Sequence, residues 1–192
     1  MLADLISIHT GCCAVIYGKG PSLRTDHRSI PDNSIKIAIN DAGYYVDDVD
    51  YLMMHDPIPE AEEILSRSYI KNPDVTMVLP SCSVFEGISF VSLVPPEADV
   101  IWYTKVWELP RKQSANGLWA GSSTTCSAVQ FANLIGCRQV RFVGFDGHGT
   151  ESYAEDWPLL AHYANPGDQK KTYMRTNAVA SGVAAFYCMR EV

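Results

Sequence analysis

The segment from Ala14 to Leu23, Ala-Val-Ile-Tyr-Gly-Lys-Gly-Pro-Ser-Leu, constrains the fold of this chain more than any other. Its apolar start predicts a buried strand, which Gly-Lys-Gly breaks at once. Two glycines allow the backbone to turn through positive φ with its N–H groups facing outward. The proline suits the first turn of a helix, where its missing N–H has no intrahelical partner. Such a helix N-terminus attracts phosphate or carboxylate, so we expect this turn to bind the phosphate of a nucleotide, through Gly18, Lys19, Gly20, Pro21 and Ser22. The alternative is a purely structural turn, because Leu23 replaces the third glycine of the dinucleotide-binding fingerprint.

Short apolar runs alternate with helical patterns along the rest of the chain. A helix is predicted from Pro59 to about Tyr69, where Asn72-Pro73 ends it, and a second from Ser123 to Gly136. Near-continuous apolar strands between helices are typical of a parallel sheet that is covered on both faces. We therefore predict an α/β fold with a doubly wound, mostly parallel, Rossmann-like sheet, and strands near residues 14–18, 35–39, 51–55, 75–79 and 139–145.

The length of 192 residues suits a single domain, residues 1–192, with a full hydrophobic core. The pattern loosens over residues 80–117, where only residues 100–103 resemble a strand. Residues 150–175 are polar, aromatic and irregular, and a last helix is predicted from Thr176 or Asn177. We expect these two loose segments to form a small irregular lid.

The composition excludes several classes of function. A formal charge of −7 argues against nucleic-acid binding, which requires a basic face. No apolar run approaches the roughly 18 residues needed to span a bilayer, and residues 1–8 lack the basic residue of a signal peptide. The six cysteines form no Cys-x-x-Cys pair and no zinc-ligand spacing. We expect a cytoplasmic protein with no bound metal, no membrane span and a small-molecule ligand. No oligomeric state follows from the sequence.

Polar residues follow most of the predicted strands. In an open parallel sheet, ligands bind beyond the carboxyl ends of the strands, so we expect Asn40 and Asp41 to contact the nucleotide. The Gly121-Ser122-Ser123 turn is a second candidate contact for an anion or a ribose, because it combines a glycine, two hydroxyls and a helix N-terminus. For each of these residues the alternative is an ordinary helix cap or turn.

Three further residues at predicted strand ends are candidates for catalysis. His55 and His148 could act as general bases, and Asp146 could hold a ribose, an acceptor or a metal. For each of them a structural role is the alternative. Lys105, with Arg111 and Lys112, forms a basic stretch that could close over phosphates, although solvated loop lysines would give the same pattern.

The chain resembles a group of Rossmann-like transferases that contains the bacterial CMP-sialic-acid-dependent sialyltransferases and the 6-hydroxymethylpterin pyrophosphokinase (MptE-like) family. The resemblance spans roughly residues 12 to 190. Its most specific part is the Gly-x-Gly-Pro-Ser-Leu turn at Gly18, followed by Asn40 at the end of the second strand. Looser matches are Gly121-Ser122-Ser123, the Leu-Gly position at Ile135-Gly136, and Gly-x-Asp at Asp146.

This resemblance implies a transferase with a nucleotide-activated sugar as donor, such as a CMP-sugar, and with no cofactor or metal. The first turn, Asn40 and the Ser122-Ser123 turn would contact the nucleotide, and Asp146 would position a hydroxyl of the acceptor or sugar. One alternative is a pyrophosphokinase, in which Mg²⁺ would be held by Asp41, Asp56 and Asp146. The other is a nucleotide-binding accessory module of phage type without catalysis, because residues 171–177 lack the histidine that serves the sialyltransferases as base. Lys19 also replaces their usual Asn, and the chain ends where relatives often continue, so we expect a short variant or a fragment.

Overall fold

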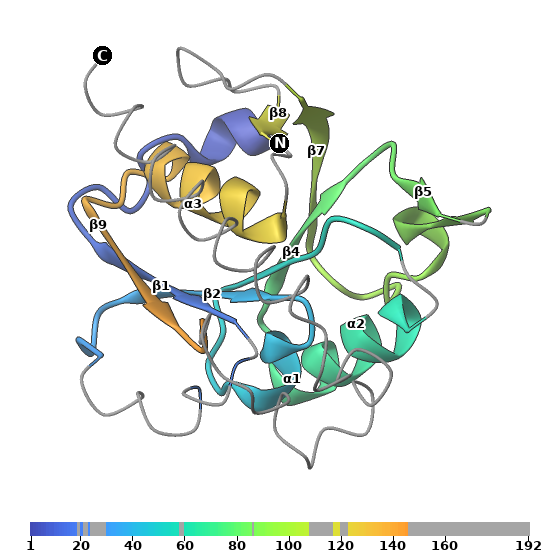
Figure 1. Cartoon of the computed structure of the whole chain (residues 1–192), viewed down its shortest axis with the longest axis horizontal. Coiled ribbons are helices and arrows are strands. Elements are labelled where there is room, and N and C mark those ends of the chain that lie inside the picture. The colour runs from blue at the N-terminus through green and yellow to red at the C-terminus, as the bar shows by residue number, and fades with distance from the viewer. Residues whose placement is uncertain are drawn as a thin grey trace, which may run out of the picture.

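A computed structural model describes residues 1–18, 20, 23, 30–57, 60–85, 87–107, 117–119 and 123–145. Within these residues, seven strands form one sheet that curls into a half-barrel (Figure 1). Every ladder in this sheet is parallel. The strand order is β8-β7-β4-β3-β2-β1-β9. The strands are β1 (Cys13–Tyr17), β2 (Ile35–Ile39), β3 (Tyr51–Met53), β4 (Thr76–Pro80), β7 (Val100–Val106), β8 (Gly117–Trp119) and β9 (Gln139–Val143).

These strands confirm the predicted α/β fold with a mostly parallel sheet. Each of the five predicted strands is present in this sheet, with bounds that shift by at most a few residues. The sequence predicted only residues 100–103 as a strand in the segment 80–117. In the structure two strands that begin in this segment, β7 and β8, belong to the main sheet. Along the chain, a small antiparallel hairpin follows β4 and precedes β7. It consists of β5 (Val84–Phe85) and β6 (Ile88–Ser89), and the 3₁₀ helix η4 (Phe90–Ser92) follows it. The predicted helices at Pro21 and Thr176 lie outside the described residues.

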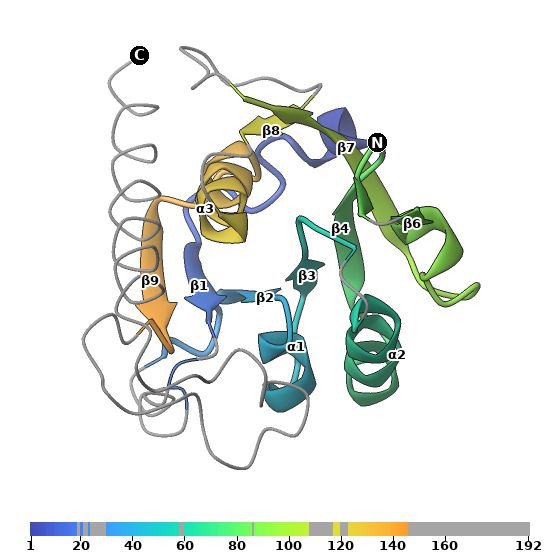
Figure 2. The same ribbon diagram turned by 45° about the vertical axis from the view of Figure 1, so that its right-hand side comes forward.

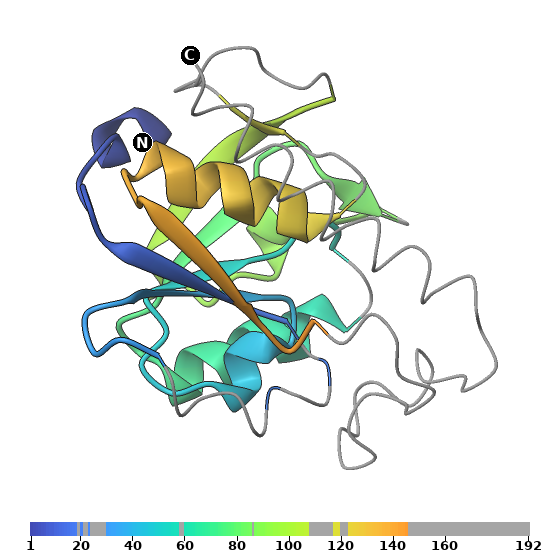
Figure 3. The ribbon, with the colours of Figure 1, turned by 60° about the vertical axis from the view of Figure 1, so that its left-hand side comes forward.

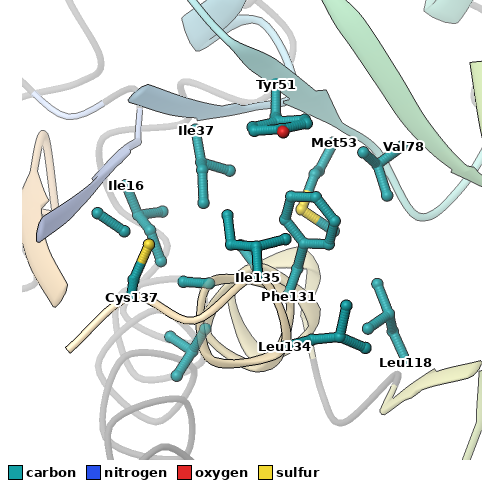
Figure 4. Close-up of a cluster of buried hydrophobic side chains, with 14 of the residues drawn as sticks. Ile16, Ile37, Tyr51, Met53, Val78, Leu118, Phe131, Leu134, Ile135 and Cys137 are labelled. Carbon is teal, nitrogen blue, oxygen red and sulfur yellow. The ribbon is translucent and has the colours of Figure 1, made fainter. Parts of the chain in front are cut away.

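Helices cover both faces of the sheet. The helices α1 (Ala42–Tyr45) and α2 (Ala61–Lys71) lie on one face, and α3 (Thr124–Leu134) lies on the other (Figure 2). Alternate strand residues serve the two layers. Val15, Ala38 and Leu52 pack toward α1 and α2, whereas Ile16 and Ile37 pack toward α3 with Phe131 (Figure 4).

The helix α3 begins close to the predicted position, with Ser123 as its N-cap residue. Its C-terminal end is held by the chain's first residues, which include the 3₁₀ helix η1 (Leu2–Leu5) and lie beside the end of α3 (Figure 3). Three backbone N–H groups, those of Ser7, His9 and Gly11, donate to the carbonyls of residues 134, 135 and 136 at 2.9, 2.7 and 3.0 Å. The carbonyls at a helix C-terminus lack intrahelical partners, so this segment satisfies them.

Asn72, the C-cap residue of α2, joins the end of α2 to α1 and to the loop between α1 and β3, beneath the other face. Its side chain is buried, and its Oδ1 accepts the N–H of Val49 at 3.1 Å. Its Nδ2 donates to the carbonyls of Gly43 and Val46, both at 3.1 Å. The sequence predicted only a helix end here, whereas the structure gives this amide a cross-linking role.

No helix in the described part of the chain is both long and apolar enough to cross a membrane.

Candidate functional site

The order of the strands reverses at β1. From β1 the chain adds β2, β3, β4, β7 and β8 outward on one side, and then returns through α3 to place β9 on the other side of β1. In open parallel sheets, ligands bind in the crevice at the carboxyl edge where such a reversal occurs. The candidate site therefore lies beyond the ends of β1 and β9, next to the end of β2.

Two short loops meet at this reversal through glycines. The N–H of Gly18 donates to the carbonyl of Val143 at 2.8 Å, and the N–H of Gly20 donates to the carbonyl of Gly144 at 2.7 Å. A Cβ on Gly18 would lie 2.6 Å from the Gly144 oxygen, and a Cβ on Gly144 would meet the Gly18 carbonyl. Neither residue could carry a side chain without separating β1 from β9.

This geometry corrects the predicted role of two glycine amides. We expected Gly18 to supply positive φ and both amides to face a phosphate. Gly18 does not adopt positive φ, which occurs instead at Gly144, with φ of +74°. Both amides donate to carbonyls of β9 and of the loop that follows it. The strand β9 pairs with β1 over the whole length of β1, and these two hydrogen bonds continue the pairing beyond the end of β1. Gly18 is required for close approach of two backbones. Lys19, Pro21 and Ser22 lie outside the described residues.

Asn40 and Asp41 follow directly on β2 at the same edge. Asn40 adopts a left-handed conformation, with φ of +53°, which asparagine tolerates better than most residues. Its N–H donates to the carbonyl of Met53 at 2.9 Å, so its backbone is fixed between two strand ends. Asp41 is the N-cap residue of α1, and its side chain is buried.

The N-terminus of α3 reaches the same edge of the sheet. Ser123 has extended backbone geometry, and its hydroxyl makes no capping hydrogen bond. It lies 3.8 Å from the Sγ of Cys126. The first N–H groups of α3 therefore donate no hydrogen bond to the N-cap side chain, which is the usual acceptor for them. Gly121 and Ser122 lie outside the described residues.

His55 lies at the carboxyl end of β3 and is held against α3. Its Nε2 is 2.5 Å from the Oγ of Ser127, and that hydroxyl donates to the carbonyl of Trp119 at 2.6 Å. Ser127 has one hydroxyl hydrogen, which goes to Trp119, so His55 donates from Nε2–H. Burial and, to a smaller extent, the nearby ammonium of Lys105 lower the pKa of His55 to about 4, against the opposing effect of Asp56. His55 is therefore a buried neutral ring at neutral pH, with its Nε2 engaged.

The same α3 surface fixes the short edge strand β8. The N–H of Trp119 donates to the Oε1 of Gln130, while its carbonyl accepts from Ser127. Ser127 and Gln130 are fully buried. Neither was predicted as a site residue, although two polar side chains three residues apart among the apolar residues of a helix are a usable signal. Burial also raises the pKa of Tyr103, which packs against His55 with a ring-centroid distance of 6.4 Å.

Lys105 joins three strand ends at this edge. Its Nζ donates to the Oδ1 of Asp56 and to the Oγ of Ser83, both at 2.9 Å. The hydroxyl of Ser83 in turn donates to the carbonyl of His55 at 2.9 Å. The structure thus combines His55 and Asp56 with one residue of the predicted basic stretch, Lys105. Ser83 was not predicted.

The remaining predicted site residues, Asp146 and His148, lie outside the described residues. Within the part of the chain that is described, no three His, Cys, Asp or Glu side chains gather into a group that could hold a metal ion.

A pocket of about 410 Å³ lies on the α1 face, away from the α3 N-terminus, and its lining includes Tyr17, Lys36 and Tyr45. Burial, with a smaller contribution from Asp50, raises the pKa of Tyr17 to about 12.

Comparison with known proteins bears on the fold. No family model matches the chain, and no curated protein matches its sequence. Among solved structures, the chain is similar to the MAf glycosyltransferase from Magnetospirillum magneticum AMB-1, with 16% sequence identity and a TM-score of 0.54. The match covers 73% of this chain and 24% of that enzyme, so the chain spans about a quarter of its length. At this identity the likeness shows a shared α/β fold.

Proposed function

We propose that this chain binds a nucleotide at the carboxyl edge of its sheet and acts as a transferase with a nucleotide-activated sugar as donor. The observation that carries the proposal is the reversal of strand order at β1, where Gly18 and Gly144 bring two loops together. Asn40 and the N-terminus of α3 belong to the same edge. This is where parallel α/β sheets bind nucleotides.

Each part of the edge has a proposed role. Since the amides of Gly18 and Gly20 donate to carbonyls of β9 and of the loop that follows it, the phosphate would lie against the N-terminus of α3 and the Ser122-Ser123 turn, where the helix dipole favours negative charge. The side chain of Asn40 would hydrogen-bond the base or ribose.

The fold shared with a glycosyltransferase supports glycosyl transfer over other reactions of nucleotides. A CMP-sugar is the donor that the resemblance to sialyltransferases favours, and Asp146 and His148 are the proposed acceptor-positioning residue and base. His55 would be a positioning residue, because its Nε2 is engaged by Ser127 and its ring is buried.

Ligand titration tests the proposal. Calorimetry with CMP, UDP, GDP and ATP, each with Mg²⁺ and with a chelator, should give binding of a pyrimidine nucleotide that survives the chelator. Strict Mg²⁺ dependence that Asp146→Asn abolishes would replace glycosyl transfer with pyrophosphoryl transfer. Binding without transfer from any activated sugar would favour the non-catalytic module. No binding of any nucleotide to the folded chain would refute the proposal.

Two substitutions separate ligand contact from folding. Asn40→Gly removes the amide but keeps the positive φ, so it should weaken nucleotide binding by about tenfold, as the loss of a good hydrogen-bonding side chain does. Asp48→Gly is the matched control, because Asp48 also has positive φ, +55°, but lies in the loop before β3 at the opposite edge. Equal losses of nucleotide affinity in both variants would show that Asn40→Gly acts through the backbone and not through a lost contact with the ligand.

A further inference from the structure

The ion pair between Lys105 and Asp56 is strongly asymmetric. The Lys105 side chain is 15% exposed, whereas the Asp56 side chain is 64% exposed. A largely desolvated ammonium is costlier without an anionic or polar partner than an exposed carboxylate, which is well solvated on its own. The lysine therefore depends on the aspartate more than the aspartate depends on the lysine.

The position of Lys105 places this charge on the α3 side of the carboxyl edge. Lys105 pairs in register with Leu118, which packs in the core on the α3 face. Tyr103, two residues earlier on the same strand, is also buried in that core. His55, which contacts α3 through Ser127, is linked to Lys105 through the hydroxyl of Ser83. The ammonium is thus at the same edge of the sheet as the candidate site, with β4 and β3 between β7 and β2, and it is linked to α3 through Ser83 and His55.

The hydrogen bonds around Lys105 fix its head group but do not exhaust it. Ser83 donates its own hydrogen to the carbonyl of His55, so it can only accept from Lys105. Asp56 accepts a second ammonium hydrogen. Within the described part of the chain, the third N–H of Lys105 has no acceptor.

We propose that Lys105 is an anion-binding residue at this edge of the sheet and that Asp56 is an exchangeable counterion, displaced when an anionic group of the ligand arrives. The anionic group is a phosphate or carboxylate of the donor. The identification of that group as part of a nucleotide-sugar rests on the function proposed above. Ser83 would hold the ammonium in place during the exchange, because its hydrogen bonds do not involve the carboxylate that leaves.

A second ion pair provides a matched control. Lys71 contacts Asp47 at 2.6 Å, with side chains that are 31% and 78% exposed. Lys71 ends α2 shortly before β4 begins, so this pair lies near the amino edge. Asp47→Asn and Asp56→Asn each remove one negative charge from an acidic chain, so they change the overall field equally.

Calorimetry with inorganic pyrophosphate tests the proposal without a nucleotide. Lys105→Met keeps the alkyl chain and should weaken pyrophosphate binding by about tenfold or more, as the loss of a charged hydrogen bond does. Asp56→Asn should strengthen binding by about two- to fivefold, which is the usual strength of an exposed ion pair. Asp47→Asn and Lys71→Met should bind as the wild type does. Circular dichroism confirms that each variant is folded.

The two proposals fail in different ways. Pyrophosphate binding that is unchanged in Lys105→Met, or weakened in Asp56→Asn, would overturn the role of Lys105, whatever nucleotides bind. Absence of pyrophosphate binding to the wild type would overturn it as well. Lys105-dependent pyrophosphate binding without nucleotide binding would support the anion site and refute the proposed function.

Two further ligand pairs identify the anion. CMP against cytidine reports a phosphate contact, and N-acetylneuraminate against its methyl ester reports a carboxylate contact. If the two members of one pair bind Lys105→Met with equal affinity, the phosphate or carboxylate in which they differ is the group that contacts Lys105. If both pairs keep the full affinity difference of the wild type, the proposal is contradicted.

Discussion

The buried ring of His55 makes the stability of this chain depend on pH. In the folded chain burial, together with the smaller effect of Lys105 and against that of Asp56, lowers its pKa to about 4 from the ordinary histidine value of 6.5. Below pH 6.5 the unfolded chain therefore binds a proton that the folded chain does not. The contribution of His55 to stability is fully present above pH 6.5 and is lost as the pH falls toward 4. At about 1.4 kcal/mol per pH unit, the loss is about 3 kcal/mol.

Urea unfolding of the wild type and His55→Gln, from about pH 7 to about pH 4, measures this contribution. Carboxylates titrate over part of the same range, but they are the same in both proteins, so their effect cancels in the difference of unfolding free energies. We expect the advantage of the wild type over His55→Gln to shrink by about 3 kcal/mol across this range.

A second variant separates burial from hydrogen bonding. Ser127→Ala removes the hydroxyl that accepts from His55 but leaves the ring buried. It should lower stability by about 1 kcal/mol or more at neutral pH and keep most of the pH dependence of the wild type, because burial is the larger cause of the pKa shift. Parallel stability curves for the wild type and His55→Gln would refute the reasoning and show that His55 is solvated or already charged in the folded chain.

Three other outcomes follow from the geometry. Asn72→Asp should destabilise the fold by roughly 3 kcal/mol or more, and by more than Asn72→Ala, because a carboxylate would replace an amide that donates to two carbonyls; urea unfolding measures both. Gly144→Ala should cost clearly more than Gly87→Ala in the same assay. Both glycines have positive φ, which costs about 1 kcal/mol for alanine, but a Cβ on Gly87 meets nothing within 4 Å, whereas one on Gly144 meets the carbonyl of Gly18; equal losses would contradict the close approach of β1 and β9. Nucleotide affinity should be the same with and without a chelator, and a chelator-sensitive titration would count against metal-free glycosyl transfer.

The sheet was largely predictable because its strands are continuous apolar runs. Residues 35–39 were predicted with the bounds that the structure gives, since the run is bounded by polar residues on both sides. The edge strand β8 was not predicted. It has three residues, and side chains of α3, Ser127 and Gln130, hold the backbone of Trp119. Contacts of this kind leave no local pattern in the strand itself.

The candidate site was predictable in its location but not in its contacts. Placing Asn40 and His55 at strand ends required only the strand bounds. The role of Gly18 required knowing that β9 would become the neighbour of β1, which depends on residues near the far end of the described chain. The contact of Lys105 with Asp56 and Ser83 likewise combines three strand ends that are separated in sequence, so spacing along the chain could not reveal it.

The hydrogen bonds between the first residues and the end of α3 have a consequence for biosynthesis. Ser7, His9 and Gly11 leave the ribosome before the sheet is made, but their carbonyl partners at residues 134–136 emerge only after most of the sheet has been synthesised. The strand β1 likewise acquires its second neighbour only when residues 139–143 are available. Until then the nascent chain has an unpaired edge on β1 and a loose N-terminal segment, both of which are open to pairing with other chains. Fast translation of the later segments would shorten this interval, and a chaperone would cover the exposed edge during it.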